Sequence, residues 1–217
     1  MTPMNPMNRP SKGRLICLEG GEGAGKSTAL EVVRDWLTAR GREVLATREP
    51  GGTPVAERIR ELLLAPETGS IDPVTELLLM FAARRENVVD MIEPALARGV
   101  DVICDRFTDA SHAYQGGGRG LGSGPVDTLA GLVHPGLVPD LVVILDVPVE
   151  TGLARIRGRA GGPDRIEGDG GEFLARVRSA YLERAQRDPE RYVVIDSDRP
   201  REVVAAELRR ALEEKLA

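Results

Sequence analysis

Aromatic residues, cysteine and histidine are all scarce in this chain of 217 residues. Aromatics make up 3% of the chain, and there are two cysteines and two histidines. Cys17 and Cys104 each lie in a short apolar run, so we expect two buried free thiols rather than a disulfide or a metal site. A reducing, cytoplasmic compartment is consistent with that pattern.

The chain also lacks a long hydrophobic run and an excess of positive charge. No apolar stretch approaches the roughly 18 residues of a membrane span, so we expect no membrane association. The formal net charge of -5 argues against a general nucleic-acid-binding protein, although a few cations suffice to bind a nucleotide phosphate. Residues 1–12 carry three prolines and no apolar signal-peptide core, which predicts a loose N-terminal tail.

Short apolar runs alternate with helical patterns along the rest of the chain. Runs rich in Val, Ile and Leu without polar alternation are typical of parallel strands buried on both faces. We therefore predict one α/β domain over residues 13–217, with three layers and a five-stranded parallel sheet between helices. The expected strands are 15–18, 43–47, 100–104, 141–147 and 192–195, and the clearest helices are 26–39, 54–65, 70–98 and 200 to the end. Gly-rich stretches at 116–124 and 158–171 are predicted to be functional or mobile loops.

One segment carries a nucleotide-binding pattern, G-x-x-x-x-G-K-[ST], between a predicted strand and a predicted helix. It reads Gly20-Gly21-Glu22-Gly23-Ala24-Gly25-Lys26-Ser27-Thr28. Glycines let consecutive backbone N–H groups face one anion, and the helix N-terminus adds the positive end of its dipole. We expect this P-loop to bind ATP, with Lys26 reaching the β- and γ-phosphates and Ser27 offering a hydroxyl to Mg²⁺.

A P-loop specifies a nucleoside triphosphate and not a reaction. GTPases, motors and small-molecule kinases all carry it, but this chain has no N-K-x-D guanine-reading motif and is short for a motor. Those absences favour a kinase with a small acceptor. A regulatory ATPase is the alternative from another class, and ATP hydrolysis without an acceptor would distinguish it.

Four further segments follow the P-loop in order, and together with it they resemble bacterial thymidylate kinases over residues 15–185. The segments are Arg48-Glu49-Pro50-Gly51-Gly52-Thr53, Phe81-Ala82-Ala83-Arg84-Arg85, Asp105-Arg106-Phe107, and AYQGGGRG from Ala113 to Gly120, continued by Asp164-Arg165-Ile166-Glu167. The resemblance implies a P-loop NTPase-type fold with a lid over about 155–171. It implies transfer of the ATP γ-phosphate to dTMP, giving dTDP for dTTP synthesis, with Mg²⁺ as cofactor and a homodimer. Another monophosphate or deoxynucleoside kinase on this fold is the alternative.

The resemblance also implies residues for the dTMP site. Arg48 and Arg106 would bind the acceptor phosphate, since a guanidinium offers a planar fork of donors; a surface salt bridge is the alternative for each. Phe81 would stack on thymine, with core packing as its alternative, and Arg85 would donate to the base carbonyl O4. Ser111, Tyr114 and Gln115 complete the implied contacts to base and sugar. The segment from Arg85 to Pro94 is one residue shorter than the corresponding segment of those kinases.

Glu22 is an acidic residue inside a phosphate-binding loop, so it must serve another partner. The resemblance implies the acceptor's sugar hydroxyl or Mg²⁺-bound water. No basic residue lies between Gly20 and Gly25, so the clamp on the transferring phosphoryl group must come from elsewhere. Arg157 and Arg159 beside the lid glycines are predicted to supply it, with Arg165 the next candidate and a solvated helix end as the alternative.

The remaining predicted roles concern ATP and the metal. Arg155, further back on the helix expected after Asp146, is expected to stack on adenine. Asp105 ends a strand, where α/β folds bind ligands, and is a predicted metal residue with Ser27, Asp164 and Glu167; fixing the neighbouring Arg106 is the alternative role for Asp105. The predicted catalytic residues are Lys26, Asp105, Arg106, Arg157 and Arg159.

Overall fold

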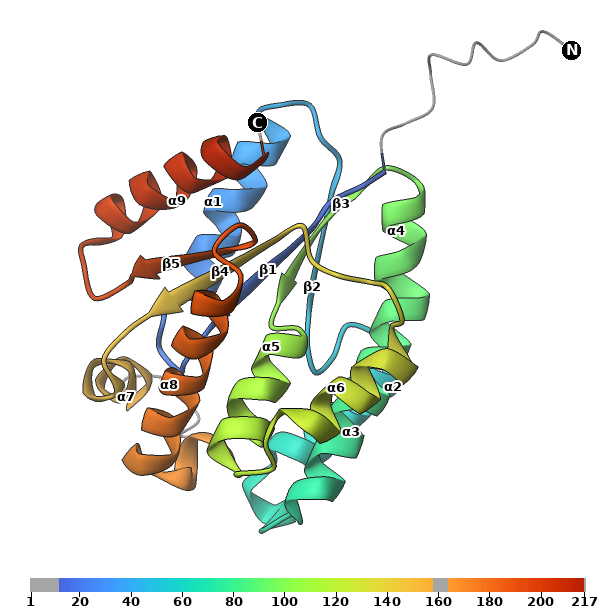
Figure 1. Cartoon of the computed structure of the whole chain (residues 1–217), viewed down its shortest axis with the longest axis vertical. Helices are drawn as coiled ribbons and strands as arrows, with labels where there is room; N and C mark the ends of the chain where they lie inside the picture. Colours follow the sequence, from blue (N-terminus) through green and yellow to red (C-terminus); the bar gives the residue numbers. More distant parts are fainter. Residues whose placement is uncertain (1–11, 158–163, 217) are drawn as a thin grey trace, which may run out of the picture.

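The computed structural model of this chain describes residues 12–157 and 164–216. The predicted tail, apart from Lys12, therefore lies outside the described residues. A five-stranded parallel sheet in the order β2–β3–β1–β4–β5 forms the centre of the fold, as predicted (Figure 1). The strands are β1 (Leu15–Gly20), β2 (Val44–Arg48), β3 (Asp101–Asp105), β4 (Leu141–Asp146) and β5 (Tyr192–Asp196).

The register of the strands decides which motifs meet at the sheet's carboxyl edge. Arg48 pairs with Asp105 across β2 and β3, and Leu18 pairs with Asp105 across β1 and β3. Gly20, at the end of β1, pairs with Leu145 of β4. The P-loop, the segment after Arg48 and the segment after Asp105 therefore leave the sheet side by side.

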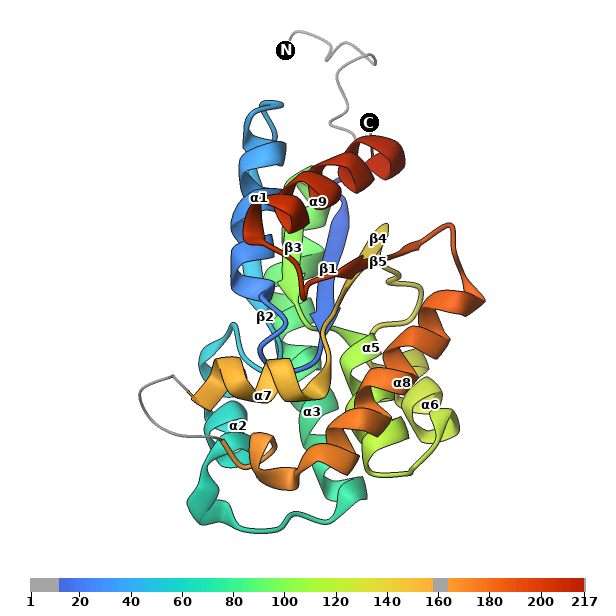
Figure 2. The ribbon, with the colours of Figure 1, turned by 90° about the vertical axis from the view of Figure 1, so that its left-hand side faces the viewer.

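Helices cover both faces of the sheet and give the predicted three layers (Figure 2). Ile16 and Leu18 face the layer of α1 (Lys26–Thr38) and α9 (Arg201–Leu216). Leu15 and Cys17, which alternate with them along β1, face the opposite layer. That layer comprises the π-helical segments η3 (Val88–Ile92) and η4 (His112–Gly118) together with α4 (Glu93–Ala97), α5 (Thr108–Ser111) and α8 (Gly171–Arg187).

The remaining helices gather at the carboxyl edge of the sheet (Figure 1). They are α2 (Pro54–Leu64), η2 (Pro66–Thr68), α3 (Pro73–Asn87), α6 (Ser123–Val133), α7 (Val149–Arg157) and the short turn η5 (Glu167–Asp169). The Thr53 hydroxyl caps α2 by accepting from the Ala56 N–H at 3.3 Å, and a proline follows it at the first helical position.

The long helix predicted over 70–98 is divided in the structure. It begins at Pro73, because the Asp72 carboxylate accepts from the N–H groups of Val74 and Thr75 and so caps it. After Asn87 the α-helix gives way to the π-helical turn η3, which ends two residues before Pro94. Proline has no N–H for a regular helical bond, so a local irregularity there has a physical cause.

The glycines at 116–118 serve packing, so the predicted functional or mobile loop is wrong for this part of the chain. They lie in η4, against α8. A Cβ at Gly118 would lie 2.5 Å from the Phe173 ring, and one at Gly117 would lie 2.8 Å from the Ala180 Cβ. Of the second Gly-rich stretch, residues 158–163 lie outside the described part of the chain.

The two cysteines are free and buried, as predicted. Cys17 and Cys104 are register partners on β1 and β3, and burial raises the pKa of both thiols. Among the described residues, no helix is both long and apolar enough to cross a membrane.

Candidate active site

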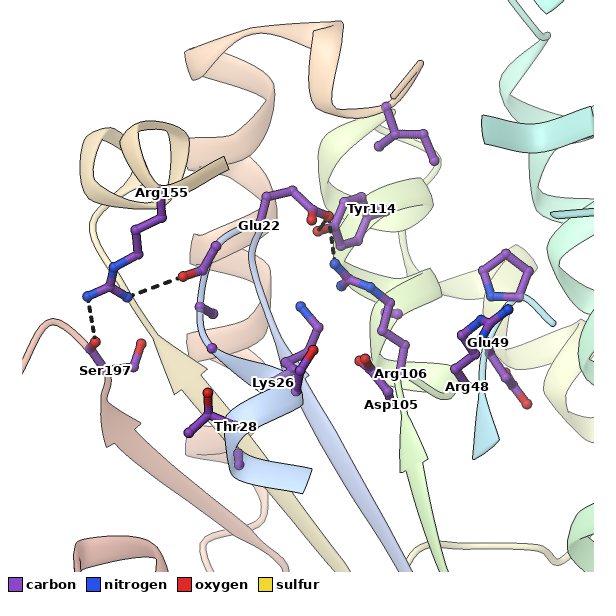
Figure 3. A pocket seen from close by; sticks show the side chains of 18 of the residues that line it. Glu22, Lys26, Thr28, Arg48, Glu49, Asp105, Arg106, Tyr114, Arg155 and Ser197 are labelled. Atoms are coloured by element: carbon purple, nitrogen blue, oxygen red, sulfur yellow. Dashed lines mark hydrogen bonds and ion pairs between the residues drawn. The ribbon is translucent and has the colours of Figure 1, made fainter. Parts of the chain in front are cut away.

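A cavity of about 870 Å³ opens at the carboxyl edge of the sheet, where α/β folds bind ligands. The P-loop lies in its middle, between an end lined by α9 and an end lined by arginines (Figure 3). The P-loop contributes residues Glu22 to Thr28 to the lining. One continuous cavity can therefore hold a nucleoside triphosphate and a second ligand together.

The P-loop connects β1 to α1, as its pattern predicts. Gly23 and Gly25 have φ values of 69° and 91°, which a residue with a side chain adopts only at a cost. The Lys26 amine donates to the carbonyl oxygens of Gly20 and Gly21 at 3.3 and 3.1 Å. Burial, with the neighbouring Arg106, lowers the pKa of Lys26. The amine is thus held inside the loop, beside the N-terminus of α1.

Helix α7 packs tightly against the P-loop at Gly152, a contact that the sequence analysis missed. A Cβ at Gly23 would lie 2.4 Å from the Gly152 carbonyl oxygen, so both positions need glycine. Three residues later, Arg155 donates to the carbonyl oxygens of Gly23 at 3.2 Å and Ser197 at 3.1 Å (Figure 3). Arg155 therefore bridges the P-loop and the loop before α9, and it lines the cavity.

The end of the cavity beyond Arg155 is formed largely by the C-terminal part of the chain, which carries no recognisable motif. No spacing in the sequence pointed to it, and only the packing of α9 beside α1 brings it to the P-loop. The lining residues there are Ser197, Arg199, Arg201, Val204, Ala205 and Leu208.

At the opposite end, the structure brings together Glu22, Arg106 and Tyr114. Oε1 of Glu22 accepts from Arg106 Nη2 at 2.6 Å and from the Tyr114 hydroxyl at 2.7 Å (Figure 3). The Arg106 guanidinium also lies 4.8 Å above the centre of the Tyr114 ring, within the range of a cation–π contact. These three predicted site residues therefore form one hydrogen-bonded group at the cavity wall.

Two further arginines face the same end of the cavity. Arg48 lines it and donates to both oxygens of Glu57 at 2.9 Å. A hydrogen bond from the Gly52 N–H, together with Arg48, lowers the pKa of Glu57. Arg60, which the sequence analysis missed, also lines the cavity and donates to the Pro50 carbonyl at 2.8 Å. Burial and the nearby Arg48 lower the pKa of Arg60.

Phe81 and Arg85 do not line the cavity, which corrects the base contacts that the resemblance implied. Phe81 is 1% exposed and packs with Leu77 and Val126, while Arg85 donates to the Val133 carbonyl at 2.7 Å on the surface. The preceding residues on α3, Met80 and Arg84, line the cavity instead. One residue along a helix is a turn of about 100°, so an error of one position moves a side chain off the site.

Arg84 is buried and unusually well held. Its Nε donates to Glu49 at 2.6 Å, and its Nη2 donates to the Phe107 carbonyl and the Ser111 hydroxyl at 2.9 and 3.1 Å. Its Nη1 is buried without a hydrogen-bond partner among the described residues. Ser111 and Gln115, both predicted, line the cavity nearby. A fixed guanidinium with a donor left over is suited to a ligand's carbonyl oxygen.

The predicted metal residues differ in what the structure shows. Ser27, Asp105 and Asp164 line the cavity, and Asp105 Oδ1 is buried without a partner among the described residues. Asp164 accepts from the Ile166 N–H at 2.9 Å, and the Glu167 side chain lies outside the description. The described residues contain no cluster of three or more His, Cys, Asp or Glu that could bind a metal alone.

The predicted phosphoryl clamp is not found in the described part of the cavity. Arg157 is exposed at the end of α7 and does not line it, and Arg159 lies outside the described residues. Arg165, the next candidate, donates to the buried Glu76 at 2.6 Å and to the Leu63 carbonyl at 2.6 Å. Arg165 therefore anchors the segment that follows residues 158–163 to α2 and α3.

A P-loop that shares one cavity with an arginine-lined second site defines a P-loop phosphotransferase for a small phosphorylated acceptor. The thymidylate kinase family model matches residues 18–208. The thymidylate kinase of Chromohalobacter salexigens is 55% identical over 94% of this chain and 97% of that protein. The thymidylate kinase of Pseudomonas fluorescens strain Pf0-1 is 56% identical over 87% of this chain and 89% of that protein.

The solved structure of thymidylate kinase from Ehrlichia chaffeensis superposes with a TM-score of 0.75 at 33% identity. The superposition covers 93% of this chain and 99% of the Ehrlichia chaffeensis chain. This chain belongs to the thymidylate kinase family.

Proposed function

We propose that this chain transfers the γ-phosphate of ATP to dTMP, giving ADP and dTDP, a step toward dTTP. Family membership supports this reaction. The structural observation that carries it is the single cavity in which the P-loop faces three arginines, Arg48, Arg60 and Arg106. The acceptor phosphate oxygen attacks the γ-phosphorus as the bond to the ADP oxygen breaks, so no protein nucleophile is needed.

ATP would lie along the P-loop toward α9. The N–H groups from Gly20 to Thr28 and the positive end of the α1 dipole suit the phosphates, and Lys26 would exchange its two carbonyl partners for phosphate oxygens. Arg155 and the apolar side chains of Val204 and Leu208 line the end of the cavity that adenine would fill.

The acceptor phosphate would bind among Arg48, Arg60 and Arg106. Each guanidinium can donate two hydrogen bonds to phosphate oxygens, and together they offset the charge of two anionic substrates held close together. Glu57 already orients Arg48, and Glu22 orients Arg106, so the fork of donors is partly arranged by the fold.

The thymine base would bind between Met80 and Arg84, which lie one helical turn apart on the same face of α3. The unpartnered Nη1 of Arg84 suits the base carbonyl O4, and the thioether of Met80 offers a polarizable apolar surface to the ring. Ser111 and Gln115 lie at the same part of the wall, while Glu22 and Tyr114 would meet the sugar and crowd its 2′ position.

Ser27 and Asp105 would hold Mg²⁺. The unpartnered Oδ1 of Asp105 fits this role, because a buried carboxylate oxygen without a donor is suited to a cation or to its bound water. When bound, Mg²⁺ neutralises charge on the β- and γ-phosphate oxygens. Asp164 lines the same cavity, and its part in metal binding, with that of Glu167, stays a prediction.

The charge on the transferring phosphoryl group still requires a cationic clamp, because Glu22 cannot supply one. We retain Arg157 and Arg159 for this role. Arg157 ends α7 directly before residues 158–163, and α7 itself contacts the P-loop through Gly152. Movement of this helix end toward the cavity would bring Arg157 to the phosphates.

The functional unit is proposed to be a cytoplasmic homodimer formed through α2, α3 and α6. The buried free thiols are consistent with a reducing compartment. Helix α3 packs against both α2 and α6 (Figure 1), and each of the three helices exposes at least one large apolar side chain. Apolar side chains repeated on adjacent helices suit a second copy of the same face. They are Val55, Leu62, Val74, Leu78 and Leu132.

The proposed reaction is tested by an acceptor panel in a coupled ADP assay with Mg²⁺ and ATP. The panel contains dTMP, dUMP, UMP, dGMP, AMP and thymidine. We expect the highest kcat/KM with dTMP. A higher value with AMP or thymidine would show that the acceptor assignment is wrong, and equal ADP release without any acceptor would favour a regulatory ATPase.

A further inference from the structure

Glu19 is a buried carboxylate that has no part in the mechanism above. It is the residue before Gly20 in β1 and is 0% exposed. Its Oε1 accepts from the backbone N–H of Phe107 at 2.7 Å, and its Oε2 accepts from the Tyr181 hydroxyl at 2.8 Å. Both donors are connected to Arg106. Phe107 is the next residue in the chain, and the Tyr181 hydroxyl accepts a hydrogen bond from the Arg106 side chain.

The backbone of Arg106 has an unusual conformation that needs support. Its φ is 70°, the one positive φ outside glycine among the described residues. This region crowds the Cβ of an L-residue, so surrounding contacts must hold the chain there. The Arg106 N–H donates to the Leu18 carbonyl at 2.9 Å, and the next N–H, of Phe107, donates to the Glu19 carboxylate. Strand β1 therefore fixes this turn through two consecutive residues.

The guanidinium of Arg106 is connected to the same carboxylate by a relay. Its Nη1 donates to the Gly20 carbonyl at 2.9 Å and to the Tyr181 hydroxyl at 3.2 Å. The hydroxyl of Tyr181, which is 1% exposed in α8, accepts from Arg106 and donates its single proton to Glu19. The acceptor oxygen of Glu19 thus sets the direction of this chain of hydrogen bonds.

We infer that Glu19 is a positioning residue for Arg106, fixing its backbone through Phe107 and its guanidinium through Tyr181. The inference rests on the proposed role of Arg106 at the acceptor phosphate. Burying a carboxyl group is unfavourable, and an apolar side chain here would extend the core formed by Leu15 and Cys17.

The raised pKa of Glu19 indicates that burying this carboxyl group costs free energy, which is consistent with a positioning role rather than a stabilising one. Burial, and after it the nearby Asp109, raise the pKa of Glu19 above its ordinary value. Arg106, the Phe107 N–H and the Tyr181 hydroxyl act in the opposite direction. The fold therefore holds a carboxyl group at a cost, and the groups that compensate it are those that orient Arg106.

Three variants separate positioning from general stability. Glu19→Gln keeps the size and one oxygen for the Phe107 N–H, but its amide nitrogen cannot accept from Tyr181. Tyr181→Phe removes the relay alone. Asp101→Asn is the matched control, because Asp101 is also 0% exposed but accepts from the Arg14 N–H and from Arg42 at the start of β3. KM and kcat for dTMP and ATP are measured for each variant, with its Tm.

We expect Glu19→Gln to lower kcat/KM for dTMP by about tenfold or more, the range for losing a hydrogen bond to a charged group, with KM for ATP changed less than about twofold. Tyr181→Phe should act in the same direction. Asp101→Asn should lower Tm and leave dTMP kinetics unchanged. A Glu19→Gln variant with an altered Tm and wild-type dTMP kinetics would overturn the inference.

Combination with Arg106→Ala distinguishes failure of this inference from failure of the proposed function. If Glu19 acts through Arg106, adding Glu19→Gln to Arg106→Ala causes no further loss, whereas fully additive losses would contradict it. Wild-type kinetics in Arg106→Ala would overturn both proposals. An impaired Arg106→Ala beside an unaffected Glu19→Gln would overturn only the inference. Should Glu19→Gln fail to fold, the same cycle with Tyr181→Phe decides the relay.

Discussion

The carboxylate of Glu22 lies 2.6 Å from the guanidinium of Arg106, which joins the P-loop to the arginine-lined end of the cavity. Both side chains are largely buried, and the Tyr114 hydroxyl donates to the same carboxylate oxygen. The Glu22 carboxylate therefore forms an ion pair with Arg106 and accepts a hydrogen bond from Tyr114, which explains how a phosphate-binding loop tolerates a negative charge. The pair also places Arg106 with respect to the P-loop.

The first prediction is that Glu22→Ala impairs use of the acceptor more than use of ATP. Arg106 loses its ionic partner, and Tyr114 loses its acceptor, so the wall that faces dTMP becomes less ordered. We expect kcat/KM for dTMP to fall by about tenfold or more, with KM for ATP changed by about twofold or less. Steady-state kinetics with each substrate varied in turn provide the measurement. An equal loss for both substrates would contradict the assignment of Glu22 to the acceptor.

Met80 and Phe81 form a matched pair for testing the base site. Met80→Ala should raise KM for dTMP several-fold, because it removes surface next to the base, and should lower stability only modestly. Phe81→Ala should cost about 3–5 kcal/mol in the free energy of unfolding, as for other large core residues, with KM for dTMP unchanged in the folded fraction. Urea denaturation and dTMP kinetics for both variants decide the point. The reverse pattern would restore the stacking role that the resemblance implied for Phe81.

Lys26→Ala should leave a folded protein that has lost most of its turnover. The Lys26 amine donates to two loop carbonyls, and the side chain belongs to none of the apolar core clusters, so its removal should leave the core intact while deleting the charge expected at the β- and γ-phosphates. Deleting one such donor typically costs about a hundredfold or more in kcat. Lys215→Ala, on α9 and outside the cavity lining, is the control. Retention of near-normal kcat by Lys26→Ala would exclude the proposed role.

Stability should fall as the pH is lowered from about 6.5 toward 4, partly through His134. Burial, with the nearby Arg84, lowers the pKa of His134 to about 4. The unfolded chain then binds a proton that the folded chain does not, so the stabilising contribution is present above pH 6.5 and is lost as the pH falls through the folded pKa. Between pH 6.5 and 5 this amounts to about 1.5 kcal/mol. Urea denaturation at both pH values should show a smaller loss for His134→Gln, and an identical loss would refute the assignment.

Much of the fold could be predicted because the local signals agreed with one another. Apolar strands without alternation, separated by helices, predicted the parallel sheet, and the spacing of the glycines and Lys26 located the P-loop between β1 and α1. The glycines of η4 were misjudged, since packing against Phe173 and Ala180 depends on a helix some sixty residues later in the chain. A pattern within one segment carries no information about such a contact.

The errors at the site have the same origin. Phe81 and Arg85 were chosen from the motif alone, and each lies one position after a residue of α3 that lines the cavity, Met80 and Arg84. Arg165 was a candidate clamp because it is a lid arginine, but its partner Glu76 is distant in sequence. No sequence motif marks Arg60 or the residues of α9, and they were recognised only because they line the cavity in the folded chain.

The most direct test of the account follows the phosphoryl group itself. The protein is incubated with Mg²⁺ and ATP labelled in its γ-phosphate, with and without dTMP, and the labelled products are separated. We predict that the label appears in dTDP, that this requires both dTMP and Mg²⁺, and that little inorganic phosphate is released. Label released as inorganic phosphate at the same rate with and without dTMP would contradict the account.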